Sequence, residues 1–162
     1  MAMVLIEGIV ACFIVLTACV AGIANGPVNM VFLYEKEVQD RAVEKGLITR
    51  ERIRKNNGLF RLFAMLPFFI FVLVSVYGVN GARGFSEGFW QITVILLTEG
   101  LFDRLFIDWY WVGKTKAWII PGTEDLMPYI YGKSLFMKWF STLVGYPVIA
   151  AVLSLIMSAV LK

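Results

Sequence analysis

Four long apolar runs restrict what this chain can fold into. They cover about residues 4–30, 60–82, 88–112 and 137–161, and each is long enough for the ~20 residues with which a helix crosses the hydrocarbon core. Hydrophobic residues make up 59% of the chain and charged residues 17%, whereas soluble domains carry about 25% charged residues. We therefore expect an all-α polytopic membrane protein, in which residues 1–162 form a single domain built on a four-transmembrane-helix bundle.

Residues 35–58 form the one long polar stretch between two of these runs. Apolar residues recur in it at helical spacing, Gly46 suits the end of a first short helix, and Thr49 suits the start of a second. The sequence Asn56-Asn57-Gly58 is expected to end that second helix before the next apolar run begins. This stretch is therefore predicted to be a helical hairpin between the first and second transmembrane helices.

The basic residues indicate how the bundle is oriented. They gather in the first and third connections, which hold Lys36, Arg41, Lys45, Arg50, Arg52, Arg54, Lys55 and Arg61, and Lys114, Lys116, Lys133 and Lys138; the opposite side holds Arg83 and Lys162. Since loops rich in Lys and Arg stay in the cytoplasm, residues 35–58 and 113–136 are predicted to be cytoplasmic and both termini outside. We expect an integral protein of a bacterial or archaeal plasma membrane, that is, the cell inner membrane.

The first apolar run is expected to be a retained helix. Residues 16–19 resemble a bacterial lipoprotein processing box, but the segment before them carries Glu7 and no Lys or Arg, the wrong charge for a signal peptide. Ala18, Gly22 and Gly26 recur at four-residue spacing, which permits close contact between helices. Gly26-Pro27 near the end of the run predicts a kink or an emerging helix.

Several classes of chemistry lack their usual residues. The chain has no histidine, and its two cysteines, Cys12 and Cys19, would lie about 10 Å apart along a helix, too far for a disulfide. This excludes a Ser-His-Asp mechanism within the chain, and we predict no metal site and no cofactor. Basic patches with interleaved aromatic residues are missing, so no nucleic acid is expected. The predicted partners are the lipid bilayer and either a second copy in a homodimer or other subunits of a membrane complex.

The third apolar run is interrupted by charges between Thr98 and Asp108. If Gly88 marks the outer boundary, Glu99 lies about 16 Å inside, near the bilayer midplane, and Asp103 lies one turn deeper. At 100° per residue, Glu99 and Asp103 share a face with Tyr110. Arg104 and Asp108 share a different face at the i,i+4 spacing and are predicted to form a structural ion pair.

A pair of carboxylates at this depth needs a physical explanation. Glu99 and Asp103 cannot both ionise cheaply where the dielectric constant is low. The pair could share a proton, bind a small cation, or meet a basic residue from another helix, for which Arg61 and Lys138 are candidates. Intramembrane carboxylates are by default candidates for function, although a buried structural network would fit them equally.

Three classes of function fit this pattern. A proton- or cation-linked transporter or carrier would use a protonatable acid at the midplane, and this is our working hypothesis. A membrane-embedded enzyme acting on a lipid or isoprenoid headgroup would use acids near the cytoplasmic side, and a non-catalytic subunit or assembly factor would use the row of small residues. Whether the chain is an enzyme stays open, and no catalytic residue is assigned. The predicted ion, proton or substrate site consists of Glu99, Asp103, Tyr110, Asn25 and Asn29.

Overall fold

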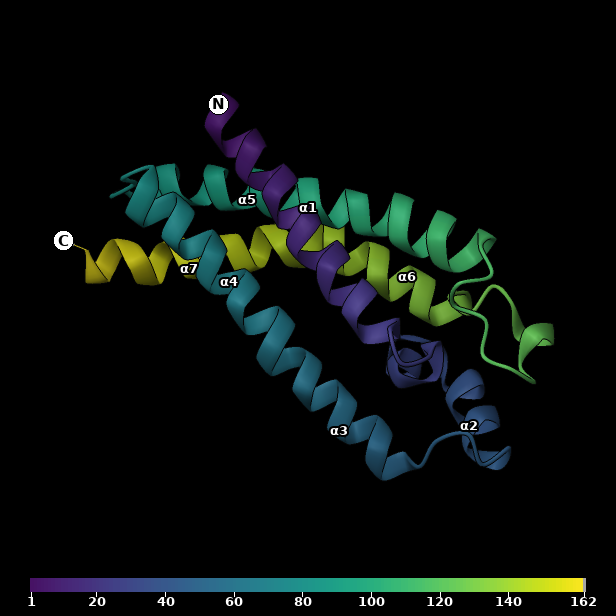
Figure 1. Cartoon of the computed structure of the whole chain (residues 1–162). Helices are drawn as coiled ribbons and strands as arrows, with labels where there is room; N and C mark the ends of the chain where they lie inside the picture. The colour runs from purple at the N-terminus through teal and green to yellow at the C-terminus, as the bar shows by residue number, and fades with distance from the viewer. Residues whose placement is uncertain (162) are drawn as a thin grey trace.

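The computed structural model of this protein describes residues 1–161, which form helices joined by turns and contain no strand (Figure 1). Its first half contains α1 (Ala2–Ile23), η1 (Pro27–Leu33), α2 (Lys36–Glu44), α3 (Arg50–Phe60), η2 (Arg61–Met65), α4 (Leu66–Leu73) and η3 (Val74–Val79). Its second half contains α5 (Phe85–Phe102), η4 (Asp103–Val112), η5 (Glu124–Leu126), α6 (Gly132–Phe140), η6 (Ser141–Gly145) and α7 (Tyr146–Val160). The all-helical fold expected from the sequence is confirmed.

Three helices of the described chain are long and apolar enough to cross a membrane. They are α1, the 30-residue helix Arg50–Val79 that runs from α3 to η3, and the 29-residue helix Gly132–Val160 that runs from α6 to α7. Even the 22 residues of α1 extend about 33 Å, which matches the ~30 Å hydrocarbon core of a bilayer. These helices are consistent with an integral membrane protein. A further long helix, α5 continued by η4, carries the polar run and is not among the three.

Two boundaries differ from the sequence prediction. Asn56-Asn57-Gly58 does not end α3, and the helix continues without interruption into η2 and α4. The amide of Asn56 donates to the backbone oxygen of Asn29 in η1 at 3.0 Å. Because the side chain is bonded there, it does not hydrogen-bond to the backbone of its own helix and interrupt it. At the other boundary, α1 ends at Ile23, because Gly26 adopts a φ of 103° and Pro27 starts a separate 3₁₀ segment.

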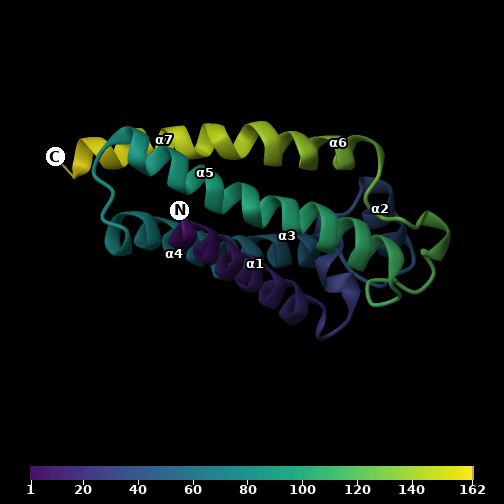
Figure 2. The same cartoon turned by 90° about the horizontal axis from the view of Figure 1, so that it is seen from above.

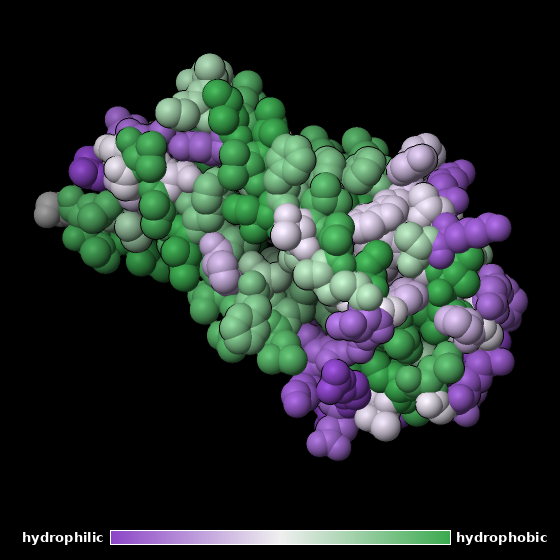
Figure 3. Space-filling model, viewed as in Figure 1, coloured by the Kyte–Doolittle hydropathy of each residue, from purple (hydrophilic) through white to green (hydrophobic). Residues whose placement is uncertain are grey.

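The helices are arranged so that α5 lies between α1 and α7, as the view from above shows (Figure 2). At one end, the start of α1 meets the turn before α5, since the amide of Asn80 donates to Glu7 Oε2 at 2.8 Å. The end of α1, α2 and residues 113–131 lie at the opposite end (Figure 1). On the face seen in Figure 3, hydrophilic residues gather at the two ends and hydrophobic residues cover most of the surface between them.

Close approach of the helices around α5 depends on glycine. A Cβ added at Gly100 would lie 2.7 Å from Cε2 of Tyr146 on α7, and one added at Gly8 would lie 2.9 Å from Cβ of Thr98. In lipid, burial of apolar surface gives little driving force between helices, so such close packing must supply much of the attraction. These contacts hold α1 and α7 against the helix that carries the polar run.

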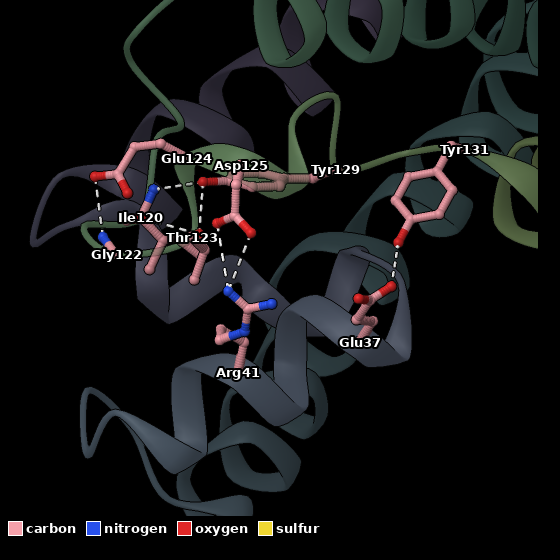
Figure 4. Close-up of polar contacts among 9 residues, drawn as sticks. All are labelled: Glu37, Arg41, Ile120, Gly122, Thr123, Glu124, Asp125, Tyr129 and Tyr131. Atoms are coloured by element: carbon pink, nitrogen blue, oxygen red, sulfur yellow. Dashed lines mark hydrogen bonds and ion pairs between the residues drawn. The ribbon is translucent and has the colours of Figure 1, made fainter.

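The loop end of the bundle is closed by a structured unit, hereafter the loop cap, made of residues 34–44 and 113–131. Figure 4 shows its polar contacts: Arg41 on α2 binds Asp125 at 3.2 Å, and the Tyr131 hydroxyl donates to Glu37 at 2.9 Å. Inside the cap, the Tyr129 hydroxyl accepts from the backbone N–H of Ile120 at 2.9 Å (Figure 4). The long connection after η4 is therefore tied to α2 and not a loose loop.

Candidate functional site

A cavity of about 190 Å³ lies between the loop cap and the point where α5 passes into η4. Five charged side chains line it: Glu99, Asp103, Arg104, Asp108 and Lys138. Three polar aromatic residues, Tyr34, Trp118 and Tyr146, complete the polar part of its wall. We refer to it below as the carboxylate cavity.

The change of helix type at Asp103 decides which charges face this cavity. From Asp103 to Val112 the helix is π-helical, with i→i+5 hydrogen bonds that place more residues in each turn than an α-helix has. Side chains in η4 are therefore rotated away from the positions that 100° per residue assigns them. In this segment Arg104 and Asp108 are buried, whereas Tyr110 is half exposed. Such π-helical segments are often found at functional sites.

Four of the five charges form one connected chain of ion pairs. Arg104 contacts the carboxylates of both Asp103 and Asp108. Lys138, which comes from α6, donates to both oxygens of Asp108 at 3.0 and 3.2 Å. Arg104 and Asp108 are each only 7% exposed, so their charges are compensated by contact rather than by water. The two cations and two of the three acids therefore balance one another.

Glu99 is the acid left outside this chain. Its side chain is 2% exposed, and its hydrogen-bond partner is the Tyr146 hydroxyl, which donates to Oε2 at 3.3 Å. Among the described residues it forms no ion pair with a cation. A buried carboxylate without a cation is costly when charged, and a bound proton removes that cost. Glu99 is thus the acid of the cavity whose charge no cation of the described residues compensates.

The side of Glu99 away from the loop cap is closed by apolar packing. Ile92, Ile95 and Leu96 on α5 are fully buried in a cluster that also contains residues of α1, α4 and α7. Beyond this layer lies a second polar group, in which the amide of Asn80 donates to Glu7 at 2.8 Å and to Gln91 at 2.9 Å. The carboxylate cavity is therefore separated from the end of the bundle that holds the termini.

The structure brings some of the predicted site residues together and leaves others apart. Glu99 and Asp103 line one cavity, and Arg104 contacts Asp108 as the spacing suggested. Asn25 and Asn29 instead line a separate groove of about 410 Å³ between α1 and α3. Tyr110 does not line the carboxylate cavity. It is 50% exposed and its ring lies 5.8 Å from that of Phe106.

Three residues of the cavity have no signal in the sequence. Tyr34 and Trp118 lie outside the apolar runs, and only the folding of the loop cap places them over the acids. Tyr146 lies in an ordinary apolar run and meets Glu99 because α7 packs on α5. Burial among the cap residues raises the pKa of Tyr34 and keeps its hydroxyl protonated.

Within residues 1–161, no three or more Cys, Asp or Glu side chains are arranged so that they could hold a metal ion. The cavity is instead of mixed charge, with hydrogen-bond donors opposite acids. Comparisons of the chain with known protein families, with curated proteins and with solved structures find no match.

Proposed function

We propose that this chain is an integral membrane protein of four spanning helices that works as a proton-linked carrier of a small polar solute. In this proposal both termini lie outside the cytoplasm, the loop cap lies inside, and Glu99 carries the proton. The three long apolar helices and the concentration of Lys and Arg at the loop-cap end support this arrangement.

The exposure pattern of α5 and η4 supports a fourth span. The residues of this helix that face outward at the depth of its charges are apolar or aromatic, as for Leu101, Leu105 and Phe106. Its charged residues are instead turned into the bundle, where Glu99 and Arg104 are buried. A helix that presents apolar side chains to lipid and hides its charges can cross a bilayer.

One observation carries the proposed activity: within residues 1–161 Glu99 has no cation partner, and it lies between a cavity on one side and a closed apolar layer on the other. The ionisable groups around it are Cys12 and Cys19 on α1, Asp103, Arg104 and Asp108 on η4, Lys138 on α6, and Tyr146 on α7. A carrier needs a binding site that opens to one side of the membrane at a time. Access from the loop-cap side would require movement of the loop cap, which covers the cavity. The opposite side would open by movement of α1 or α7 against α5.

Proteoliposomes that contain a pH indicator test this function. Succinate, inorganic phosphate or choline is added outside, and a carrier should change the internal pH with at least one of them. Glu99→Gln keeps the shape of the side chain but cannot exchange a proton, so it should abolish the change. Glu44→Gln, at an exposed position of α2, is the matched control and should behave as wild type. A wild-type response from Glu99→Gln, or no response to any of the three solutes, would refute the proposal.

A second candidate is an enzyme that acts on a lipid headgroup. It is favoured by one observation: Arg104 and Asp108 also line a groove of about 580 Å³ that contains Trp109, Lys114 and Trp139. Lys114 lies 5.3 Å above the ring of Trp109, an arrangement suited to the membrane–water interface. An enzyme would release a water-soluble product from nanodiscs of phosphatidic acid or phosphatidylglycerol, and Asp108→Asn would stop it. A carrier would leave these lipids unchanged.

A further inference from the structure

The carboxylate cavity contains buried hydrogen-bond donors that no protein group satisfies. Among the described residues, the Tyr34 hydroxyl, the Trp118 indole N–H and the Nε–H of Arg104 have no hydrogen-bond partner. All three side chains line the cavity, and they are 3%, 0% and 7% exposed. Buried polar groups are nearly always hydrogen-bonded, so three such atoms at one cavity require an explanation.

The chemistry of these atoms defines what could satisfy them. An indole N–H and a guanidinium N–H can only donate, and a protonated phenol donates readily. The acceptors nearby are already engaged: Asp103 by Arg104, Asp108 by Arg104 and Lys138, and Glu99 by Tyr146. Among the described residues, none of these carboxylates accepts a hydrogen bond from the Tyr34 hydroxyl, the Trp118 indole N–H or Nε of Arg104, so a ligand that brings acceptor oxygens would satisfy them. A metal cation would not supply such oxygens, because it competes for the same carboxylates and offers nothing to an N–H.

The charge of the cavity permits an anion when Glu99 is protonated. Asp103 and Asp108 carry two negative charges, and Arg104 and Lys138 carry two positive charges, so the cavity without Glu99 is neutral. A protonated Glu99 keeps it neutral, whereas an ionised Glu99 would repel an incoming anion. If a proton binds Glu99 when the anion enters, the anion therefore meets a neutral cavity instead of a negatively charged one.

The size of the cavity limits the ligand. Its volume of about 190 Å³ is equivalent to about six water molecules at ~30 Å³ each. Pockets for drug-sized ligands are larger, about 300–1,000 Å³. The cavity suits a small metabolite or the polar group of a larger molecule.

We propose that the carboxylate cavity binds an oxyanion, the carboxylate or phosphate group of its solute, and that Tyr34 and Trp118 donate hydrogen bonds to it from the loop cap. The inference rests on the proposed function, since the oxyanion is the solute that travels with the proton on Glu99. It assigns the loop cap a direct part in recognition: two of the three donors belong to cytoplasmic segments that close the cavity rather than to membrane helices. Nε of Arg104 supplies the third donor from η4.

Calorimetric titration of the full chain in phosphatidylcholine nanodiscs tests the inference. Succinate and inorganic phosphate are the probes, and choline is the cationic comparison. Tyr34→Phe and Trp118→Phe remove one donor each and keep an aromatic ring, and each should weaken binding by about tenfold or more, because a hydrogen bond to a charged acceptor is lost. Tyr131→Phe and Trp90→Phe are the matched controls, since Tyr131 donates to Glu37 outside the cavity and Trp90 lies at the opposite end. Both controls should bind as wild type.

A second arm identifies where the oxyanion comes from. Nanodiscs that contain phosphatidic acid present a phosphate on a lipid. If this lipid displaces succinate and inorganic phosphate, or is retained by wild type and lost from Trp118→Phe, the group arrives on a lipid headgroup. If the free probes bind and the lipid does not compete, the oxyanion is a soluble solute. Either result supports an oxyanion site.

The outcomes separate this inference from the proposed function. It is overturned if neither probe nor the lipid binds, if choline alone binds, or if Tyr34→Phe and Trp118→Phe both bind as wild type, which would mean that water satisfies these donors. Thermal unfolding checks that each variant is folded. If Trp118→Phe does not fold, Tyr34→Phe alone tests the inference. Binding that depends on Tyr34 and Trp118 without any coupled pH change would refute the carrier and leave the oxyanion site standing. Coupled pH changes without such binding would support the carrier and refute the oxyanion site.

Discussion

Asp108 is the residue on which the buried charges of the cavity converge. It accepts two hydrogen bonds from Lys138 and contacts Arg104, and all of this occurs with only 7% of its side chain exposed. Asp108→Asn would leave the half-buried Lys138 without its carboxylate partner and the buried Arg104 with Asp103 as its remaining one. We expect the substitution to destabilise the protein by about 3–5 kcal/mol, because breaking a buried pair leaves an uncompensated charge. Thermal unfolding in detergent with added lipid measures this loss.

The control for this experiment is the same substitution in an exposed pair. Asp125 binds Arg41 at 3.2 Å, but its side chain is 65% exposed. Asp125→Asn should therefore cost less than about 1 kcal/mol. Equal losses at the two positions would show that the buried network contributes no more than a surface ion pair.

Glu124 in the loop cap gives a prediction about pH. Backbone N–H groups of Gly122 and of Glu124 itself bind its carboxylate, the former at 2.9 Å, and they lower the pKa of Glu124. Because the folded-state pKa lies below that of the unfolded chain, this contact stabilises the turn fully above the unfolded value of about 4.3. The stabilisation disappears as the pH falls through the folded-state value. Hydrogen exchange at the Gly122 amide, corrected for its intrinsic rate, should speed up in this acid range. Glu124→Gln should exchange fast even at about pH 6 and lose the pH dependence.

At the scale of single helices, the sequence identified the acids and the Arg104–Asp108 pair, but it did not predict which other side chains of η4 lie beside the acids. The positions of Glu99 and Asp103 follow from their depth in an apolar run, which is a local property. A wheel of 100° per residue, however, groups Asp103 with Tyr110 and separates it from Arg104. The structure joins Asp103 to Arg104 and leaves Tyr110 half exposed. The π-helical turns hold more residues than the wheel assumes, so positions read from the wheel drift further from the structure with each residue after Asp103.

Helix ends show the same division between local and tertiary causes. The predicted start of α3 at Thr49 is confirmed, since the Thr49 hydroxyl accepts from the N–H of Arg52 at 3.1 Å, and Gly46 adopts a positive φ of 69° where α2 ends. These are interactions within a few residues of chain. The predicted break at Asn56-Asn57-Gly58 is wrong because Asn56 finds a partner on η1, 27 residues earlier in the sequence.

Two glycines in long helices should respond to alanine in opposite ways. Gly58 lies in α3 with nothing within 4 Å of an added Cβ, so Gly58→Ala should stabilise the helix by about 0.5–1 kcal/mol. Gly100 lies in α5, where an added Cβ would be 2.7 Å from Tyr146 and 2.8 Å from Thr142. Gly100→Ala should destabilise by about 1–3 kcal/mol, because α7 must move away. Thermal unfolding of both variants is the measurement, and changes of the same sign would contradict the close packing of α5 on α7.

Considered as a whole molecule, the protein combines features that its sequence predicts with one that it does not. Apolar runs of membrane length predict helices, because length and composition are local. The all-helical fold is confirmed for the described residues, and three of the four predicted spans are helices long and apolar enough to cross a membrane. The loop cap was not predicted as a unit. It forms through contacts between segments about 80 to 95 residues apart, such as Arg41 with Asp125 and Glu37 with Tyr131. It is this long-range docking that places Tyr34 and Trp118 over the acids.

The arrangement of the two ends leads to a prediction of topology. The loop cap and the start of α3 hold most of the basic residues, so they should lie in the cytoplasm, and the turn before α5 should lie outside. Glu44→Cys and Ser86→Cys place one thiol at each end, both at exposed positions. The native Cys12 and Cys19 are buried and should contribute little labelling.

A membrane-impermeant maleimide added to intact cells should label Ser86→Cys and leave Glu44→Cys unmodified until the membrane is opened. The physical reason is that the cytoplasmic retention of Lys and Arg acts on the whole loop, and eight basic residues between α1 and α4 outweigh Arg83 in the turn between α4 and α5. Labelling of Glu44→Cys from outside would show that the orientation is the opposite of the one predicted, with the carboxylate cavity toward the exterior. Labelling of both thiols in intact cells would mean that the chain between them does not cross the membrane an odd number of times, which would remove the basis for the proposed carrier.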